Sequence, residues 1–145
     1  MMSQRERNIR AATIKLIEAE IRNYHRTVED LRDMEEAIAL PGAVGDDIGR
    51  IQSRPGDPTS ARAMRMMTST QLMEIRRRVE AIEYMIRTLQ ASPESGRLEL
   101  IRLAYWDGRY TVKGGCEQLS MSERTYYRWR REALQLVAER LGWDI

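Results

Sequence analysis

The sequence has very little of the chemistry that most enzymes and metal sites require. Of its 145 residues, one is a cysteine, Cys116, and one is a histidine, His25. A single cysteine cannot form a disulfide within the chain, and a chain without disulfides fits a reducing, intracellular compartment. One cysteine and one histidine far apart in sequence provide neither a zinc ligand set nor a nucleophile–base pair. We therefore expect no enzymatic activity, no metal and no cofactor, with Cys116 in the core and His25 at the surface.

Long apolar runs and strand patterns are also missing. No stretch approaches the roughly 18 apolar residues of a membrane span. The start of the chain, Met1 to Arg7, is polar and does not resemble a signal peptide. Apolar residues instead recur at helical spacing along most of the chain. The sequence predicts an all-α protein that neither enters a membrane nor carries a signal peptide.

Lysine is scarce as well, because 22 of the 24 basic residues are arginine and only Lys15 and Lys113 are lysine. The formal net charge is only +2, which excludes an indiscriminate polycation. Arginine suits phosphate and guanine recognition because its planar fork can donate two parallel hydrogen bonds. Coding bias in a GC-rich genome would produce the same preference for arginine.

Two apolar stripes predict a helical arm over residues 1–93. The first stripe predicts one helix from about residue 4 to Leu40, and its members are Ile14, Ile17, Ile21, Tyr24, Val28, Leu31 and Ile38. The second predicts a helix from about Thr59 to Gln90, capped by Thr59 or Ser60, and its members are Leu72, Ile75, Val79, Ile82, Ile86 and Leu89. Between them, residues 41–58 are rich in glycine and proline and predict a loop. The long helices could fold back on each other as a hairpin, or each could pair with another copy in a coiled-coil-like arrangement.

The remaining residues, 97–145, predict a separate module of short helices. An apolar run over 98–105 suits a mostly buried helix, and Gly108 lies in a turn signal that allows positive φ. Thr111 would cap a second helix, Val112 to about Leu119. A three-residue turn, 120–122, would then lead into a third helix capped by Ser122. Two short helices joined by a tight turn, the second one cationic, form a helix-turn-helix.

The helix that starts after Ser122 has an apolar face and a basic face. Tyr126, Trp129, Ala133 and Val137 recur at helical spacing and predict the packed side. Between residues 122 and 131, four arginines stand against one glutamate. Apolar contacts that fix a helix, with guanidinium groups facing outward, are typical of a DNA-reading helix. A solvated basic face on an ordinary amphipathic helix is the simpler alternative.

The module resembles the helix-turn-helix of sigma-70 region 4. The resemblance rests on Leu103-x-Tyr105-x-x-Gly108, Thr111, Cys116-x-x-Leu119-x-Met121-Ser122-x-x-Thr125-x-x-Arg128 and Ala133-Leu134. Two positions depart from that pattern. Ser120 stands where a left-handed glycine is usual. Gly115, preceded by Gly114, stands where an apolar residue is usual, and two glycines cost roughly 1 kcal/mol each in a helix, so we expect a second helix that frays or starts late.

The whole chain resembles the RinA/ArpU family, which are phage-encoded activators of late-gene transcription in Gram-positive hosts. The length, the two long helical segments, the interrupting Gly56-Asp57-Pro58-Thr59 and the C-terminal module carry this resemblance. It implies binding to double-stranded DNA at a late promoter, in the cytoplasm of a bacterial host cell, and leaves open a contact with host RNA polymerase. Homo-oligomerisation would suit such a protein, because two modest DNA contacts become one strong one; a monomeric bundle is the alternative.

The resemblance assigns roles to eight residues. Arg124, Thr125 and Arg128 would reach base edges. Tyr127, Arg130 and Arg131 would hold phosphates. Thr111 and Lys113 would anchor the preceding helix to the DNA backbone.

Two other functions fit the same features. A phage small terminase subunit also joins a helix-turn-helix to helical oligomerisation elements, and it forms rings on packaging-site DNA. A protein-only adaptor could use the module to bind a polymerase or another partner.

Overall fold

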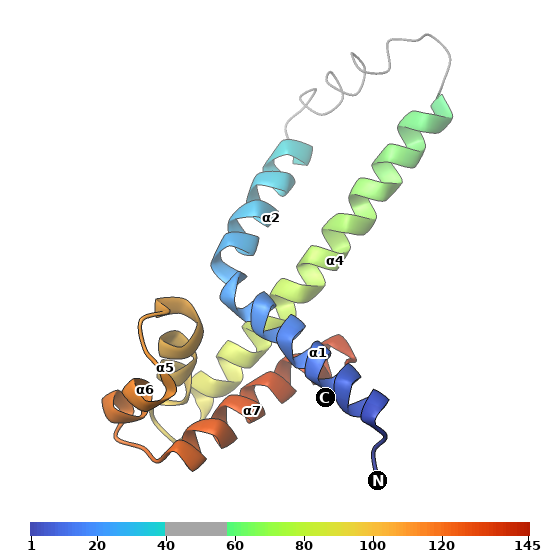
Figure 1. Cartoon of the computed structure of the whole chain (residues 1–145). Coiled ribbons are helices and arrows are strands. Elements are labelled where there is room, and N and C mark those ends of the chain that lie inside the picture. The colour runs from blue at the N-terminus through green and yellow to red at the C-terminus, as the bar shows by residue number, and fades with distance from the viewer. Residues whose placement is uncertain (40–57) are drawn as a thin grey trace. The chain divides into compact units, whose positions relative to one another are not determined.

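The computed structural model describes residues 1–39 and 58–145, and side chains except those of residues 58–67. These ranges are helical and contain no strand, which confirms the all-α prediction (Figure 1). In chain order the elements are α1 (Gln4–Arg22), α2 (Tyr24–Ala39), α4 (Pro58–Ala91), α5 (Arg97–Ile101), the π-helix η1 (Arg102–Asp107), α6 (Val112–Leu119) and α7 (Glu123–Leu141). The predicted loop lies outside the described residues except for its last member, Pro58, which begins α4.

The contacts divide the chain into two compact units. The first unit comprises Met1–Tyr24 and Glu80–Ile145, and the second comprises His25–Val79. This division does not coincide with the predicted boundary between 93 and 97, because α1 and the end of α4 belong with the C-terminal helices. The functional division into an arm, 1–93, and a DNA-binding module, 97–145, stays a prediction.

The core of the first unit draws on every helix in it. α1 contributes Ile17 and Ile21, which are both fully buried. The end of α4 contributes Ile82 and Met85. The C-terminal helices add Leu100, Ile101, Tyr105, Cys116, Tyr126, Ala133, Leu134, Val137, Ala138 and Leu141. Such shared burial of apolar side chains is the main stabilising contribution to a small domain.

The single helix predicted from residue 4 to Leu40 is two helices, which corrects that prediction. α1 ends at Arg22, and the Asn23 N–H donates to the Ala19 carbonyl at 3.0 Å. The Ile21 carbonyl accepts a hydrogen bond from the Trp106 indole N–H at 2.9 Å. A side-chain donor that bonds to a helix carbonyl favours a break in the backbone ladder, so the end of α1 coincides with a contact to a residue far away in sequence.

The second unit contains α2 and the first part of α4, which run antiparallel (Figure 1). Arg76 Nε lies 2.9 Å from Glu35 Oε1 and joins the two helices. Leu72 and Val79 of the second stripe are buried, whereas α2 has no fully buried residue. The arrangement agrees with the hairpin that the sequence offered as one of two alternatives. Pairing with another copy stays a prediction.

The start of α4 differs by one residue from the prediction. Pro58 is its first residue, so Thr59 and Ser60 lie inside the first turn rather than at the cap. Proline suits this position because its fixed φ is helical and the first backbone N–H of a helix has no intrahelical acceptor.

The helix predicted over 98–105 is the short α-helix α5 followed by the π-helix η1. Two side chains of η1 reach α1. The Tyr105 hydroxyl donates to Glu18 Oε2 at 2.8 Å, and Trp106 donates to Ile21 as described above. Burial, together with the Glu18 carboxylate, raises the pKa of Tyr105, so this hydroxyl remains a donor at neutral pH. The turn that ends η1 has Gly108 at φ 64°, as predicted.

Candidate nucleic-acid interface

The connection between α6 and α7 is built by two capping side chains. Thr111 Oγ1 accepts from the Gly114 N–H at 3.1 Å at the start of α6. Ser122 Oγ accepts from the Thr125 N–H at 3.2 Å at the start of α7. Both caps were predicted from sequence, and together they set the ends of the connection over residues 120–122.

Ser120 has a left-handed backbone, with φ 52° and ψ 47°. The Met121 N–H donates to the Cys116 carbonyl at 3.0 Å, and the Ser120 N–H donates to the Glu117 carbonyl at 3.3 Å. These two bonds form a Schellman motif. The same motif ends α7, where Gly142 takes the left-handed position at φ 73°. Ser120 therefore takes the left-handed position at the end of α6 that Gly142 takes at the end of α7.

We expect Ser120→Gly to raise the free energy of unfolding by roughly 1 kcal/mol, because the left-handed conformation strains a residue with a Cβ. Urea denaturation of the full chain measures the change. Ser122→Ala is the opposite control, since loss of that cap should lower the free energy of unfolding by about 1 kcal/mol. A Ser120→Gly variant less stable than the parent would show that the serine hydroxyl matters more than the strain.

The two glycines of α6 do not delay the start of the helix, which corrects the expectation of a late start; fraying stays a prediction. α6 begins at Val112, directly after its cap. A Cβ on Gly115 would lie only 3.1 Å from the Tyr126 ring, which is itself 2 % exposed. Gly115 therefore allows α6 to approach α7 closely, and the cost in helix propensity is offset by this packing.

One face of α7 is packed into the core, as predicted. Tyr126, Ala133 and Val137 are buried. Trp129 is half-buried, and the Arg97 guanidinium lies over its ring at 4.9 Å from the centroid. Arg97 also forms ion pairs with Glu132 and Glu94. These contacts hold α7 in one rotational position, so its other side chains have defined directions.

The opposite face of α7 presents Arg124, Arg128 and Arg131 to solvent. Their spacing of four and three places them on one side of the helix. Among the described residues, none of the three has a hydrogen-bond or ion-pair partner. Arg97, Arg102 and Arg140 of the same unit each pair with at least one carboxylate. The basic face of α7 is therefore a set of cations without internal counter-charges in the described ranges.

Tyr127 and Arg130 form a stacked pair beside this face. The Arg130 guanidinium lies 4.9 Å from the centroid of the Tyr127 ring and 6.0 Å from that of Tyr126. Tyr127 is 45 % exposed, which is high for a large aromatic side chain. Thr125 is half-buried, and its Oγ1 accepts from the Ser122 hydroxyl at 3.0 Å. Part of its bonding capacity is therefore used within the turn.

The two residues predicted to anchor α6 to the DNA backbone lie at the start of this helix. Thr111 and Lys113 are both exposed, and Thr111 serves as the cap. Two neighbours that sequence reasoning treated only as a turn, Arg109 and Tyr110, are also exposed. The Tyr110 ring packs against Gly114, where a Cβ would lie 3.7 Å away. In the sequence, Gly114 was the sign of this contact, but it was interpreted only as a residue that destabilises a helix.

Other chemistry in the described residues is limited. Cys116 is buried, as predicted, and burial raises the pKa of its thiol, which leaves it protonated at neutral pH. No group of three or more His, Cys, Asp or Glu in the described ranges could hold a metal ion. None of the helices in those ranges has an apolar stretch long enough to cross a membrane.

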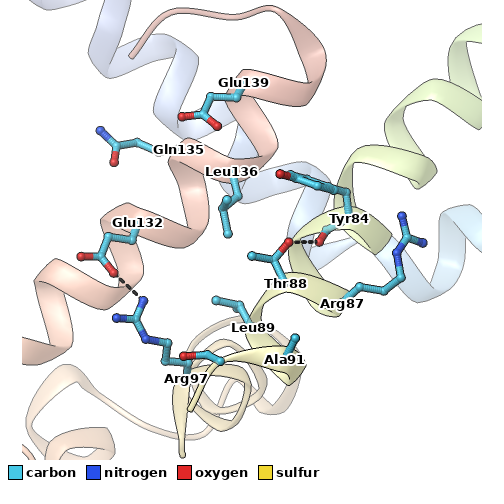
Figure 2. A pocket seen from close by; sticks show the side chains of 11 residues that line it. Tyr84, Arg87, Thr88, Leu89, Ala91, Arg97, Glu132, Gln135, Leu136 and Glu139 are labelled. Atoms are coloured by element: carbon cyan, nitrogen blue, oxygen red, sulfur yellow. Dashed lines mark hydrogen bonds and ion pairs between the residues drawn. The ribbon is translucent and has the colours of Figure 1, made fainter. Parts of the chain in front are cut away.

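A groove of about 740 Å³ lies between the end of α4 and α7 (Figure 2). Its lining includes Tyr84, Leu89, Leu136 and the ion pair between Arg97 and Glu132. Since the Arg97 guanidinium already forms ion pairs with Glu132 and Glu94, the groove offers less to an anionic ligand than the exposed face of α7.

Comparison with known proteins gives one informative similarity. The chain is 26 % identical over 149 residues to the transcriptional activator RinA of Staphylococcus phage phi11, and the match covers 99 % of this chain and 100 % of RinA. No model of a protein family matches the chain. No solved structure matches it either. The similarity therefore extends over both units rather than over the C-terminal helices alone.

Proposed function

We propose that the chain is a sequence-specific double-stranded DNA-binding protein, a phage activator of late-gene transcription related to RinA. In this proposal α6, the connection and α7 form a sigma-70 region 4-like helix-turn-helix, and α7 enters the major groove. The similarity to RinA over 99 % of the chain supports the activator role and the family.

The observation that carries the proposal is the face formed by Arg124, Arg128 and Arg131. Bringing a guanidinium to guanine or phosphate costs less when no internal ion pair must first be broken, and none of the three has one in the described ranges. The buried face of α7 holds these arginines in register, which a freely rotating surface helix would not do. Such a preorganised helix loses little entropy on binding.

Within this proposal, Arg124, Thr125 and Arg128 read base edges. Tyr127, Arg130 and Arg131 hold phosphates. Thr111 and Lys113 bind the DNA backbone at the start of α6, and we add Arg109 to this group because it is exposed next to them. Two further parts of the proposal come from the sequence: action as a homo-oligomer, which the apolar stripes and the gain from paired DNA contacts favour, and contact with host RNA polymerase.

Selection of binding sites from random double-stranded DNA tests the proposal. We expect enrichment of a defined sequence, which footprinting then shows to be protected. The association constant should fall steeply with salt. Each phosphate contact makes the slope of log K against log salt more negative by roughly 0.9. Absence of any enriched sequence, with no gel shift on phage or host DNA, would favour the adaptor function.

The mass of the protein in solution separates transcription from packaging. A monomer, dimer or tetramer fits an activator, whereas a ring of eight or more subunits would favour a small terminase subunit. Light scattering on the full chain decides between them.

A further inference from the structure

α1 carries a second apolar stripe that the core does not use. Met2, just before the helix, and Ile9 and Leu16 within it are spaced by seven residues, and they are 40 %, 55 % and 58 % exposed. Ala12 lies at the intervening heptad position between Ile9 and Leu16, and Ala19 is at the next such position after Leu16; Ala12 is exposed and Ala19 half-buried. The corresponding position between Met2 and Ile9 is Arg5, so the continuous apolar seam begins at Ile9. Residues 9, 12, 16 and 19 thus follow the alternating spacing of a coiled-coil seam.

This stripe is distinct from the face of α1 that packs into the first unit. The packed face consists of Ile14, Ile17 and Ile21, of which the last two are fully buried. At 100° per residue, the centre of the exposed stripe is displaced from that face by roughly 140° around the helix. The exposed stripe can therefore meet a partner while the packed face remains in the core.

We propose that this stripe pairs with the same stripe of a second copy, so that two α1 helices form a parallel two-stranded coiled coil. The proposal names the surface for the homo-oligomer suggested above and rests on that suggestion. Ile9 and Leu16 would occupy a positions and pack against their equivalents. Ala12 and Ala19 at d positions would allow the helices to approach closely.

The charges beside the stripe identify the partner and its direction. With Ile9 and Leu16 at a, Lys15 is a g residue and Glu20 is the e residue of the following heptad. In a parallel pair, Lys15 of each copy faces Glu20 of the other, which gives two attractive contacts across the seam. In an antiparallel pair in which residues 9–19 overlap fully, Lys15 would face Lys15 and Glu6 would face Glu20. Of these two arrangements, only the parallel one brings Lys15 against a carboxylate.

Sedimentation equilibrium of the full chain without DNA tests the pairing. We expect a dimer whose dissociation constant rises at least about 100-fold in Leu16→Glu. The substitution removes the contact in which Leu16 of each copy becomes buried on pairing. Met73→Glu is the matched control, since Met73 is 67 % exposed on α4 and lies outside the stripe; its dissociation constant should not change. Circular dichroism verifies that both variants keep the parent's helix content.

The direction of pairing has its own tests. In a Cys116→Ala background, Leu16→Cys should form a disulfide-linked dimer, because residue 16 faces itself only in a parallel pair. Lys15→Glu should weaken the dimer, and Lys15→Glu with Glu20→Lys should restore it. A monomer at every concentration, or an unchanged dissociation constant in Leu16→Glu, overturns the proposal; cross-linking only between positions 12 and 16 overturns the parallel arrangement. Because no DNA is present, these failures leave DNA binding untouched.

Discussion

Arg128→Ala should abolish the preference for the selected DNA sequence while weak, salt-sensitive binding remains. Arg128 is exposed in the middle of the basic face of α7 and has no partner among the described residues. A bidentate contact between arginine and guanine discriminates against a wrong base by about 1–3 kcal/mol. The ratio of specific to non-specific binding constants should therefore fall by roughly 5- to 150-fold per site. Gel shifts with the selected sequence and a scrambled one measure this ratio.

Two further variants separate base reading from charge. Arg128→Lys keeps the charge but lacks the planar fork, so we expect the sequence preference to fall while the salt dependence stays close to that of the parent. Arg87→Ala removes an arginine of α4 that is 60 % exposed and should change neither quantity. Footprinting in which Arg128→Ala still protects the parent's site would show that Arg128 does not read bases.

A fragment of residues 97–145 should fail to fold by itself. The sequence predicts a module with these limits, but the core of the first unit also requires residues of α1 and α4. Ile17, Ile21, Ile82 and Met85 are 0–2 % exposed, and without them the C-terminal helices would expose much of their apolar surface. Short chains bury too little surface to offset their conformational entropy. Circular dichroism should show little helix and no cooperative thermal transition.

Single substitutions in the full chain test how far the core depends on the side chains of α1. Ile21→Ala should lower the free energy of unfolding by about 2–5 kcal/mol, because the side chain is fully buried. Ile38→Ala removes the same atoms from a side chain that is 47 % exposed on α2, and its effect should be much smaller. If the isolated fragment unfolds cooperatively with full helix content, α1 is dispensable for the core.

Local signals in the sequence predicted the C-terminal helices well. Thr111 and Ser122 cap α6 and α7 as expected, because a side-chain oxygen satisfies backbone donors within three residues. The positive φ of Gly108 followed from the Asp-Gly pair. The buried face of α7 followed from the spacing of Tyr126, Ala133 and Val137. Each of these features depends on residues close together in the chain, so the sequence alone contains the information.

The candidate site shows the limit of such local reasoning. Spacing placed Arg124, Arg128 and Arg131 on one face of a helix, and the structure agrees. Spacing could not show that these arginines lack carboxylate partners in the described ranges while Arg97 and Arg140 have them, because those partners come from other helices.

By itself the sequence therefore determined the helical class, the caps and the basic face of α7, since these follow from helical periodicity and from hydrogen bonds within a few residues. Only the tertiary structure decided that α1 ends at Arg22, that Gly115 serves the Tyr126 contact, and that α1 belongs to the C-terminal core. The reason is physical. Each of these depends on a contact between residues distant in sequence, such as the hydrogen bond from Trp106 to the Ile21 carbonyl.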